Sequence, residues 1–361
     1  MLPLMSSRLE EYARILVEDC VDVQAGWQVL VRAQPLARPL VEEVMRQIAR
    51  RGAYALLRLQ YELLGETAWL KEAPEGLIRK LPSIAAFMLD NADCMIGIRA
   101  PENTREGSDI PPERLGMASQ ASRPHSEPFT AGRKPWVGCQ YPTEALAQDA
   151  GMTLPQFEEF LYGAVLIDWD SLERDMERIA ERFDAATEVR ILAEGTDLSF
   201  SLEGRRGKVS AAGANMPSGE VFYSPVESST TGVVSFNEFP AVHAGHQVAG
   251  VRLRFEEGRI VDASADSDEE FLHKTLDTDA GARVLGEFGI GCNPGIQQHT
   301  RNTLFDEKID GTVHLAVGNG WPAIGGVNKS AIHWDIVKDL RGGGQLFCDG
   351  ELVQENGEWK F

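Results

Sequence analysis

In the first half of the chain, short apolar runs alternate with longer segments in which apolar residues recur at helical spacing. The runs predict strands and the amphipathic segments predict helices. Strands separated by helices are typical of βαβ units, so this half is expected to be an α/β domain with a mostly parallel sheet. The predicted strands are 26–33, 54–61, 94–100 and 134–143, and the predicted helices are 36–51, 75–89 with an interruption at Pro82, 154–165 and 170–184.

The segment 101–133 interrupts this alternation. It is rich in Pro, Ser, Glu and Arg. Two interpretations remain open, a linker or a lid or dimer-contact segment packed over a site. No predicted strand in this half is followed by GxGxxG or GxxxxGK[ST], so the domain carries no nucleotide-binding signature.

Near residue 185 the pattern changes to short stretches of alternating apolar and polar residues with glycines at the turns. Residues 247–265 predict a hairpin with a Glu-Gly turn, and one helical stretch is expected near 267–286. The sequence therefore predicts a domain boundary here. The α/β domain spans 1–185, and a β-rich α+β domain spans 186–361.

Composition narrows the class of protein. The length of 361 residues suits two domains, and a net charge of −20, from 35 basic and 55 acidic side chains, repels nucleic acid. The N-terminus lacks a signal-peptide pattern, and no apolar run approaches the ~18 residues that span a bilayer. Five scattered cysteines without a CxxC pair indicate neither a disulfide framework nor a thiolate zinc site. A cytoplasmic protein with no membrane or nucleic-acid partner is expected.

The segment KSAIHWDIVKD (329–339) carries the most informative pattern for chemistry. Residues two apart in a strand share a face, so His333 and Asp335 should project side by side from a buried strand. An ionised Asp without a partner costs several kcal/mol to bury. A metal ion would offset this cost, and a structural His–Asp hydrogen bond would do the same.

Three further residues lie in similar apolar, glycine-rich settings. His314 lies in TVHLAVG, and Glu220 and Glu287 each follow a glycine and precede an aromatic stretch. Taken singly, His314 fits a core histidine, and each Glu fits a turn. Together with His333 and Asp335 they supply three carboxylates and two imidazoles, which suits two divalent ions about 3.5–4 Å apart. The nitrogen and oxygen ligands favour Zn²⁺, Co²⁺, Mn²⁺ or Mg²⁺.

The remaining histidines receive a structural interpretation. His125, His273 and His299 lie in polar stretches and are expected to be exposed or in loops. His243 and His246 have HxxH spacing but no neighbouring carboxylate, which argues against a ligand pair. Residues expected to be turn residues or partners behind the ligands are Asp306, Glu307 and Lys308.

The motifs are similar to those of the aminopeptidase T, aminopeptidase S and aminopeptidase II family of metallopeptidases, over nearly the whole chain. The matching segments, in order, are LVEDCVDVQAGWQVLVRA, YPTEALAQDAGMTLPQFEEFLYGAVLIDW, GTDLSFSLEGR, NMPSGEVFYSPVE, LGEFGIGCNPGI, LFDEKIDGTVHLAVG and SAIHWDIVKDLR. The resemblance implies a homodimeric aminopeptidase of broad specificity that acts on peptides with two metal ions in its C-terminal domain. The implied ligands are Glu220, Glu287 as the bridging group, His314, His333 and Asp335.

The chain departs from the family at one position. Seven residues after His314, where members usually carry a Tyr thought to assist catalysis, this chain has Trp321. An indole N–H can donate a hydrogen bond but has no ionisable hydroxyl, and Tyr223 is one alternative source of a hydroxyl.

Two other functions stay open. One is a mononuclear iron(II) ring-cleaving dioxygenase that would use His333, Asp335 and one further His. Such an enzyme would have no use for Glu220 and Glu287 as ligands. The other is a catalytically weak metal-binding relative, and the position of Trp321 is its only support.

Overall fold

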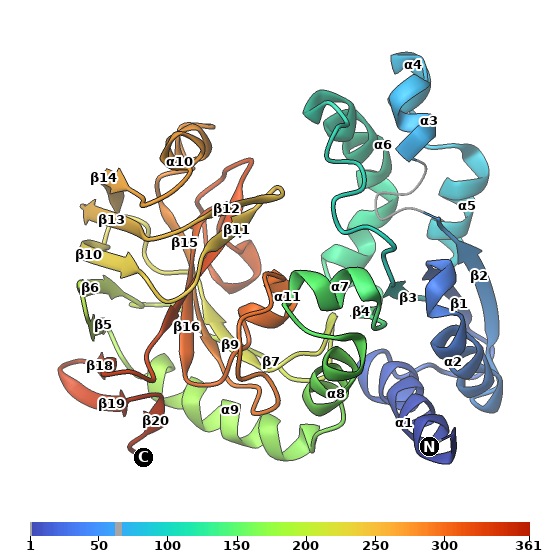
Figure 1. Cartoon of the computed structure of the whole chain (residues 1–361), viewed down its shortest axis with the longest axis horizontal. Coiled ribbons are helices and arrows are strands. Elements are labelled where there is room, and N and C mark those ends of the chain that lie inside the picture. The colour runs from blue at the N-terminus through green and yellow to red at the C-terminus, as the bar shows by residue number, and fades with distance from the viewer. Residues whose placement is uncertain (1, 62–66) are drawn as a thin grey trace. The chain divides into compact units, whose positions relative to one another are not determined.

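The computed structural model describes residues 2–61 and 67–361, and it divides into two compact units (Figure 1). The N-terminal unit comprises Met1–Leu166 and Ala212–Pro217, and the C-terminal unit comprises Ile167–Ala211 and Ser218–Phe361. The predicted boundary after residue 185 differs from this division. Helix α9 (Trp169–Asp184) belongs to the C-terminal unit, because its Phe183 packs against Phe288 with ring centroids 5.9 Å apart.

The N-terminal unit is built on the predicted parallel sheet. Its five strands lie in the order β2-β1-β3-β4-β8, and each neighbouring pair is parallel. The fifth strand, absent from the prediction, is only two residues long and comes from the second half of the chain. The strands are β1 (Gln28–Ala33), β2 (Tyr54–Leu59), β3 (Cys94–Arg99), β4 (Trp136–Gln140) and β8 (Asn215–Met216).

The helices of this unit follow the apolar periodicity in most places. Pro82 interrupts the predicted helix 75–89 as expected, leaving a short helix before it and a longer one after it. The helical elements are α1 (Leu2–Arg14), which continues as a π-helix (Ile15–Cys20), a 3₁₀ turn (Pro35–Ala37), α2 (Arg38–Arg50), α3 (Thr67–Glu72), α4 (Glu75–Ile78), α5 (Ser83–Asn91), α6 (Pro112–Thr130), α7 (Glu144–Asp149) and α8 (Leu154–Val165).

Helix α6 corrects the interpretation of 101–133 as a plain linker. Most of that segment forms a 19-residue helix, although Pro124 and Pro128 lie inside it. A proline interior to a helix removes a backbone hydrogen bond, so this proline-rich composition does not predict a helix. Contacts with α4 and α5 hold the helix within the N-terminal unit.

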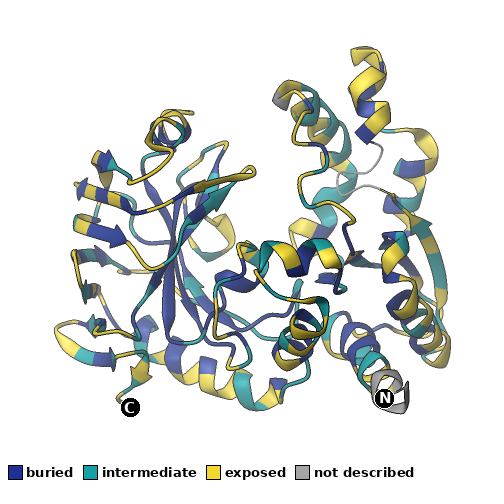
Figure 2. Ribbon diagram, viewed as in Figure 1, coloured by how far each residue is buried: buried dark blue, intermediate teal, exposed yellow. Residues whose placement is uncertain are grey.

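The C-terminal unit packs two largely antiparallel sheets face to face. The eight-stranded sheet has the order β14-β13-β10-β6-β5-β18-β19-β20, and the five-stranded sheet has the order β17-β16-β15-β9-β7. Phe200 of one sheet and Phe288 of the other lie 4.9 Å apart between ring centroids, so the core fills the space between the sheets. Figure 2 shows the central strands as the most continuously buried part of this unit.

The strands of the larger sheet are β5 (Glu188–Ala193), β6 (Thr196–Ser201), β10 (Thr231–Phe236), β13 (Val251–Glu256), β14 (Arg259–Ser264), β18 (Gln345–Cys348), β19 (Glu351–Glu355) and β20 (Glu358–Trp359). Those of the smaller sheet are β7 (Lys208–Ser210), β9 (Glu220–Tyr223), β15 (Leu285–Gly291), β16 (Thr312–Gly318) and β17 (His333–Asp339). A separate hairpin pairs β11 (Ala241–His243) with β12 (His246–Val248).

The structure tests two local predictions in this unit, a hairpin and a helix. The hairpin at 247–265 forms as β13 and β14, with Glu257 and Gly258 in the turn at positive φ. The helix near 267–286 is shorter than expected, since α10 spans only Glu269–Leu276. Asp279 accepts hydrogen bonds from the backbone N–H groups of Gly281 and Ala331, which favours a turn over a longer helix. Within the described part of the chain, no helix has the length and apolar character to cross a bilayer.

Candidate metal centre

All five predicted ligands converge on one face of the smaller sheet of the C-terminal unit. The Nε2 atom of His314 lies 3.2 Å from Glu287 Oε1 and 3.6 Å from Glu220 Oε2. The Nε2 atom of His333 lies 3.3 Å from Glu287 Oε2 and 3.5 Å from Asp335 Oδ1. The residues form two groups, each with ligand atoms within 4.8 Å of one another, and both groups contain Glu287.

Strand alternation explains this convergence. The β16–β17 register pairs Ala316 with Asp335 and Gly318 with His333, so the ligands of these strands share one face. Gly289 lies opposite His314 in the β15–β16 register. A Cβ atom there would lie 2.0 Å from His314 Nε2, so the imidazole occupies space that only a glycine leaves open.

Each imidazole is oriented by a backbone carbonyl. The Nδ1 atom of His314 lies 2.9 Å from the oxygen of Glu307, and the Nδ1 atom of His333 lies 2.9 Å from the oxygen of Asn319. Because a carbonyl oxygen only accepts, Nδ1 must donate in both rings. The Nε2 atoms therefore face the carboxylates, as in histidines that bind metal ions.

Burial and charge make the centre unusual for a protein interior. Glu220, Glu287 and His314 are 6%, 4% and 0% exposed. Burial alone would raise the pKa of Glu287, but hydrogen bonds from His314 and His333 hold it well below its usual range. Burial also disfavours charge on the imidazoles, yet the neighbouring carboxylates outweigh it. They raise the pKa of His314 to about 9 and that of His333 to about 12.

These features fit a bound divalent cation. Asp335 Oδ1 is buried and has no hydrogen-bond partner, although His333 Nε2 lies 3.5 Å away. A buried carboxylate oxygen without a partner is costly unless a cation satisfies it. Several buried carboxylates with imidazole nitrogens as co-ligands form a donor set typical of Zn²⁺, Co²⁺, Mn²⁺ and Mg²⁺.

Lys308 and Glu307 lie directly behind the candidate ligands. The sequence had suggested either this position or a turn for these residues. Lys308 is fully buried, with its Nζ atom 3.3 Å from Glu220 Oε1 and in contact with Glu307. Burial opposes the charge of Lys308, but the two carboxylates outweigh this and raise its pKa. Burial also raises the pKa of Glu307 to about 8, against the lowering effect of Lys308.

Trp321 borders the centre. Its indole Nε1–H donates a hydrogen bond to Glu287 Oε2, and its ring packs edge-on against His333 at 5.1 Å between centroids. The suggestion that Tyr223 supplies the missing hydroxyl is wrong, because its side chain lies on the face of β9 opposite Glu220. The hydroxyl of Tyr223 donates to the backbone oxygen of Ala180 and to Asp184 in the core, at 3.1 Å each.

His299 was expected to be exposed or in a loop, and it lies in a loop without being exposed. The side chain is mostly buried, and its ring stacks on Phe239 with centroids 4.9 Å apart. Burial lowers the pKa of His299 to about 4, and its Nε2 atom lies 3.1 Å from Asp306. No nearby hydrophobic periodicity in the sequence signals this packing, because the residue lies in an irregular loop.

The other histidines are not among the candidate ligands, although His243 packs against Trp334 with centroids 5.3 Å apart and lies close enough to Asp335 and His333 for their charges to shift its pKa. His243 and His246 face each other across the β11–β12 hairpin, and His246 Nδ1 lies 2.8 Å from Asp268. Among the described residues, neither belongs to a group able to share an ion.

The expectation that His125 is exposed or in a loop is wrong, since it lies in α6 with its side chain 29% exposed and contacts Asp90 at 2.7 Å. His273 is partly exposed on α10.

Known proteins resemble this chain over nearly its whole length. The family model for the thermophilic metalloproteases (M29) matches residues 5–359. Aminopeptidase 2 of Geobacillus stearothermophilus is 27% identical over 98% of this chain and 98% of that protein. The solved structure of wild-type AmpT from Thermus thermophilus has a TM-score of 0.83 at 23% identity, covering 98% of this chain and 99% of that chain.

A second solved structure bears on the alternative function. A 2,5-dihydroxypyridine dioxygenase from Pseudomonas putida has a TM-score of 0.59 at 14% identity, covering 98% of this chain and 97% of that chain. At this level of identity the likeness shows a shared fold and nothing about activity.

Proposed function

Because this chain belongs to the thermophilic metalloprotease (M29) family, we propose that it is a metal-dependent aminopeptidase, which removes N-terminal residues from peptides. One observation carries the proposal: two groups of potential ligands, one of them fully buried and the other partly buried, share the carboxylate of Glu287. A shared carboxylate between two sets of ligands is the arrangement expected for a two-metal hydrolase.

The proposed ligand assignment follows the two groups. Glu220, Glu287 and His314 would hold one divalent ion, and Glu287, His333 and Asp335 the other. Zn²⁺, Co²⁺, Mn²⁺ and Mg²⁺ all suit these ligands. When bound, such ions supply Lewis-acid polarisation of the scissile carbonyl and a water of lowered pKa.

The protein's own groups prepare the site for that chemistry. The carbonyls of Glu307 and Asn319 fix the two imidazole rings, and Lys308 compensates the charge of Glu220 from the buried side. The indole N–H of Trp321 holds the carboxylate of Glu287 in place. These contacts preorganise the ligands, so little ordering remains when a substrate binds.

The mononuclear iron(II) alternative explains less of this site. It would use His333, Asp335 and one further His, leaving Glu220 and Glu287 without a ligand role. Both carboxylates are nevertheless buried within the same cluster. A single ion at His333 and Asp335 would leave the grouping of Glu220 and Glu287 with His314 unexplained.

Two further parts of the proposal concern the protein's state in the cell. We propose a homodimer, on the strength of the family resemblance. We also propose the cytoplasm as its location, because all five cysteines are free thiols, which suits a reducing compartment.

The test uses the purified full-length protein and leucine p-nitroanilide. Activity should be lost after chelation and restored by Co²⁺ or Zn²⁺, with two ions per chain in the active form. Leucine p-nitroanilide with an acetylated amino group is the control and should not be cleaved. Activity that is indifferent to metal would contradict the proposal. Oxygen uptake with iron(II) and a dihydroxypyridine would instead support the dioxygenase.

A further inference from the structure

Phe222 and Trp321 form an aromatic corner beside the candidate metal ligands of the C-terminal unit. Their ring centroids lie 6.3 Å apart, with an angle of 61° between the ring planes. The Trp321 ring also packs edge-on against His333, with centroids 5.1 Å apart, and its indole N–H donates to Glu287. The aromatic corner therefore borders both residues of the ligand cluster that lie nearest to Trp321.

The strand register places Phe222 on the ligand-bearing face of the smaller sheet. Phe222 of β9 pairs with Gly289 of β15, and Gly289 pairs in turn with His314 of β16. Directly paired residues of neighbouring strands share a face, so Phe222 and His314 flank a position that has no side chain. The neighbours of Phe222 in β9, Val221 and Tyr223, are fully buried in the core on the opposite face.

Both rings leave apolar surface open beside the ligands. Trp321 is 41% exposed although its indole N–H reaches a buried carboxylate, and Phe222 is partly exposed. Holding Glu287 needs only the nitrogen edge of the indole, so it does not account for the rest of this surface. Small-molecule sites are lined mainly by apolar and aromatic side chains around a few polar groups. The aromatic corner and the ligands together have this composition.

The backbone around Trp321 is held in place by hydrogen bonds. Its N–H donates to Ser224 Oγ at 3.0 Å, and its carbonyl oxygen accepts from the N–H of Gly326 at 2.9 Å. A Cβ atom at Gly326 would lie 2.6 Å from Ser224 Oγ, so a glycine is needed for this close approach. Because Ser224 directly follows β9, one short segment positions both aromatic rings. A surface fixed in this way is preorganised for binding.

We propose that the aromatic corner receives the side chain of the first residue of the substrate, and that this residue is preferentially apolar. The inference rests on the proposed aminopeptidase function, in which the carbonyl of the first residue lies at the metal centre. The side chain of that residue starts one bond from the carbonyl carbon's neighbour, so it must contact surface adjacent to the ligands. Apolar side chains gain from burial against the two rings, whereas polar ones lose hydrogen bonds to water.

The first test compares the p-nitroanilides of leucine, asparagine and alanine on the purified full-length protein with Co²⁺ or Zn²⁺. Leucine and asparagine side chains have nearly the same shape and differ in polarity, and alanine lacks most of the apolar surface. We expect kcat/KM for leucine to exceed that for either of the others by about tenfold or more. Equal values for the three would overturn the subsite and leave the aminopeptidase standing. No cleavage of any of them would remove both proposals.

Phe222→Ala tests the corner itself, because it removes one ring and no candidate ligand. The leucine-to-alanine ratio of kcat/KM should fall by about fivefold or more, while kcat/KM for alanine changes by about threefold or less. Phe222→Leu keeps an apolar side chain and should retain most of the ratio. Val327→Ala is the control, since Val327 is an exposed apolar residue of the same loop, and it should leave the ratio unchanged. An unchanged ratio in Phe222→Ala would refute the assignment.

Amine binding gives a second readout that does not depend on turnover. 3-Methylbutylamine carries the amino group and side chain of leucine without its carbonyl, and ethylamine corresponds to alanine in the same way. In calorimetric titrations the native protein should bind 3-methylbutylamine about tenfold or more tightly than ethylamine, and Phe222→Ala should lose most of this preference. Equal affinities of the two amines for the native protein would contradict an apolar subsite, whether or not the variant folds.

Discussion

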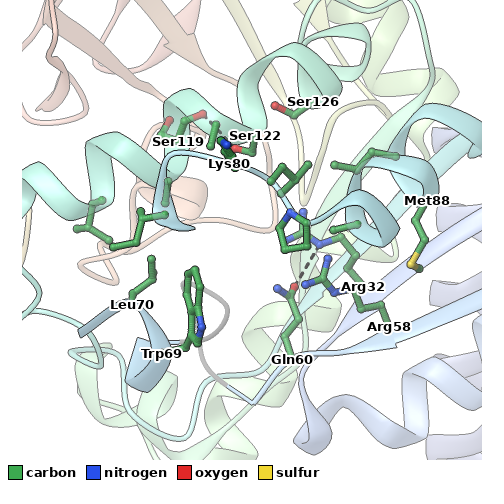
Figure 3. A pocket seen from close by; sticks show the side chains of 18 of the residues that line it. Arg32, Arg58, Gln60, Trp69, Leu70, Lys80, Met88, Ser119, Ser122 and Ser126 are labelled. Atoms are coloured by element: carbon green, nitrogen blue, oxygen red, sulfur yellow. Dashed lines mark hydrogen bonds between the residues drawn. The ribbon is translucent and has the colours of Figure 1, made fainter. Parts of the chain in front are cut away.

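The polar groups of the two units differ in charge and in the way they are held. In the C-terminal unit, three carboxylates and two imidazoles project from neighbouring strands, and backbone carbonyls orient both rings. In the N-terminal unit, the long basic side chains of Arg32, Arg58 and Lys80 line a cavity of about 680 Å³ between the sheet and its helices (Figure 3). The first arrangement is fixed by the strand register, whereas the second depends on adaptable arginine and lysine side chains.

This difference bears on what each region can hold. Buried carboxylates in fixed positions are stable only when cations lie in matching positions beside them. Compact metal ions meet this requirement better than flexible ligands. A cavity bordered by long flexible side chains and apolar walls can adapt to contents of different size. Substitutions that alter the charge of one region should therefore leave the other unaffected.

The largest effect is expected for Glu287→Gln. An amide cannot supply two anionic oxygens, so both metal groups lose a ligand at once. Peptidase activity should fall about a thousandfold or more, since metal chemistry contributes several kcal/mol to the barrier. Metal content measured by mass spectrometry should drop for both ions. Glu270→Gln, on the exposed face of α10, is the control and should behave like the native protein.

Glu220→Gln and Asp335→Asn separate the two metal groups. Each substitution removes a ligand from one group and leaves the other intact. Metal content should fall from two ions to one in each variant, and activity should fall about a hundredfold. If either variant loses both ions, or neither, the assignment of separate groups is wrong.

Lys308→Met tests the buried countercharge. Its removal leaves Glu220 and Glu307 without their buried cation, and breaking such a buried pair costs about 3–5 kcal/mol. Denaturant unfolding should show this loss in the metal-free protein. Lys308→Arg keeps the charge and serves as the matched variant. Equal stability of Lys308→Met and the native protein would show that the ammonium is dispensable.

The pH dependence of stability should differ between metal-free and metal-loaded protein. Folding raises the pKa of His314 to about 9 and that of His333 to about 12, above the ordinary value of 6.5. The stability from these protonated rings is fully present below pH 6.5 and is lost as the pH rises through the folded values. Thermal unfolding of chelator-treated protein should therefore show declining stability between pH 6.5 and 9.

The metal-loaded protein is the control for this effect. Bound ions replace the protons on the rings, so the decline should be absent or much smaller. Metal binding at pH 7 should also release protons, which titration in buffers of different ionisation enthalpy detects. Metal-free stability that stays level or increases over this range would contradict the charge arrangement described for the cluster.

The smallest effect is expected at Trp321. Trp321→Phe removes the N–H that donates to Glu287, and Trp321→Tyr supplies a hydroxyl at the same place. Each should change kcat by about tenfold or less, because the indole supports a ligand and supplies none. An increase in kcat for Trp321→Tyr with KM unchanged would indicate that the hydroxyl assists the reaction. Identical kinetics for all three proteins would show that the indole N–H is dispensable.

Sequence periodicity predicted the elements that obey simple alternation. The strands that carry His314 and His333 were predicted because apolar residues flank each polar one, and the structure confirms that His333 and Asp335 share a face. Helix α6 could not be foreseen, because its internal prolines argue against a helix. The packing of α9 on the C-terminal unit likewise depends on tertiary contacts that no local pattern records.

The candidate site was predictable to a similar extent. Its five candidate ligands stand in conspicuous apolar settings, but the buried position of Lys308 depends on a loop folding back behind Glu220. The pairing of Arg32 with Arg58 follows from the register of two strands 26 residues apart, which the sequence does not encode locally. Pairs of this kind become visible only when the strands are placed side by side.

The most direct test of the two-ion centre is anomalous diffraction at the zinc absorption edge from crystals of the full-length protein grown with Zn²⁺. We expect two anomalous peaks about 3.5–4 Å apart, both within bonding distance of the Glu287 carboxylate. A single peak at His333 and Asp335, or two peaks without Glu287 between them, would contradict it.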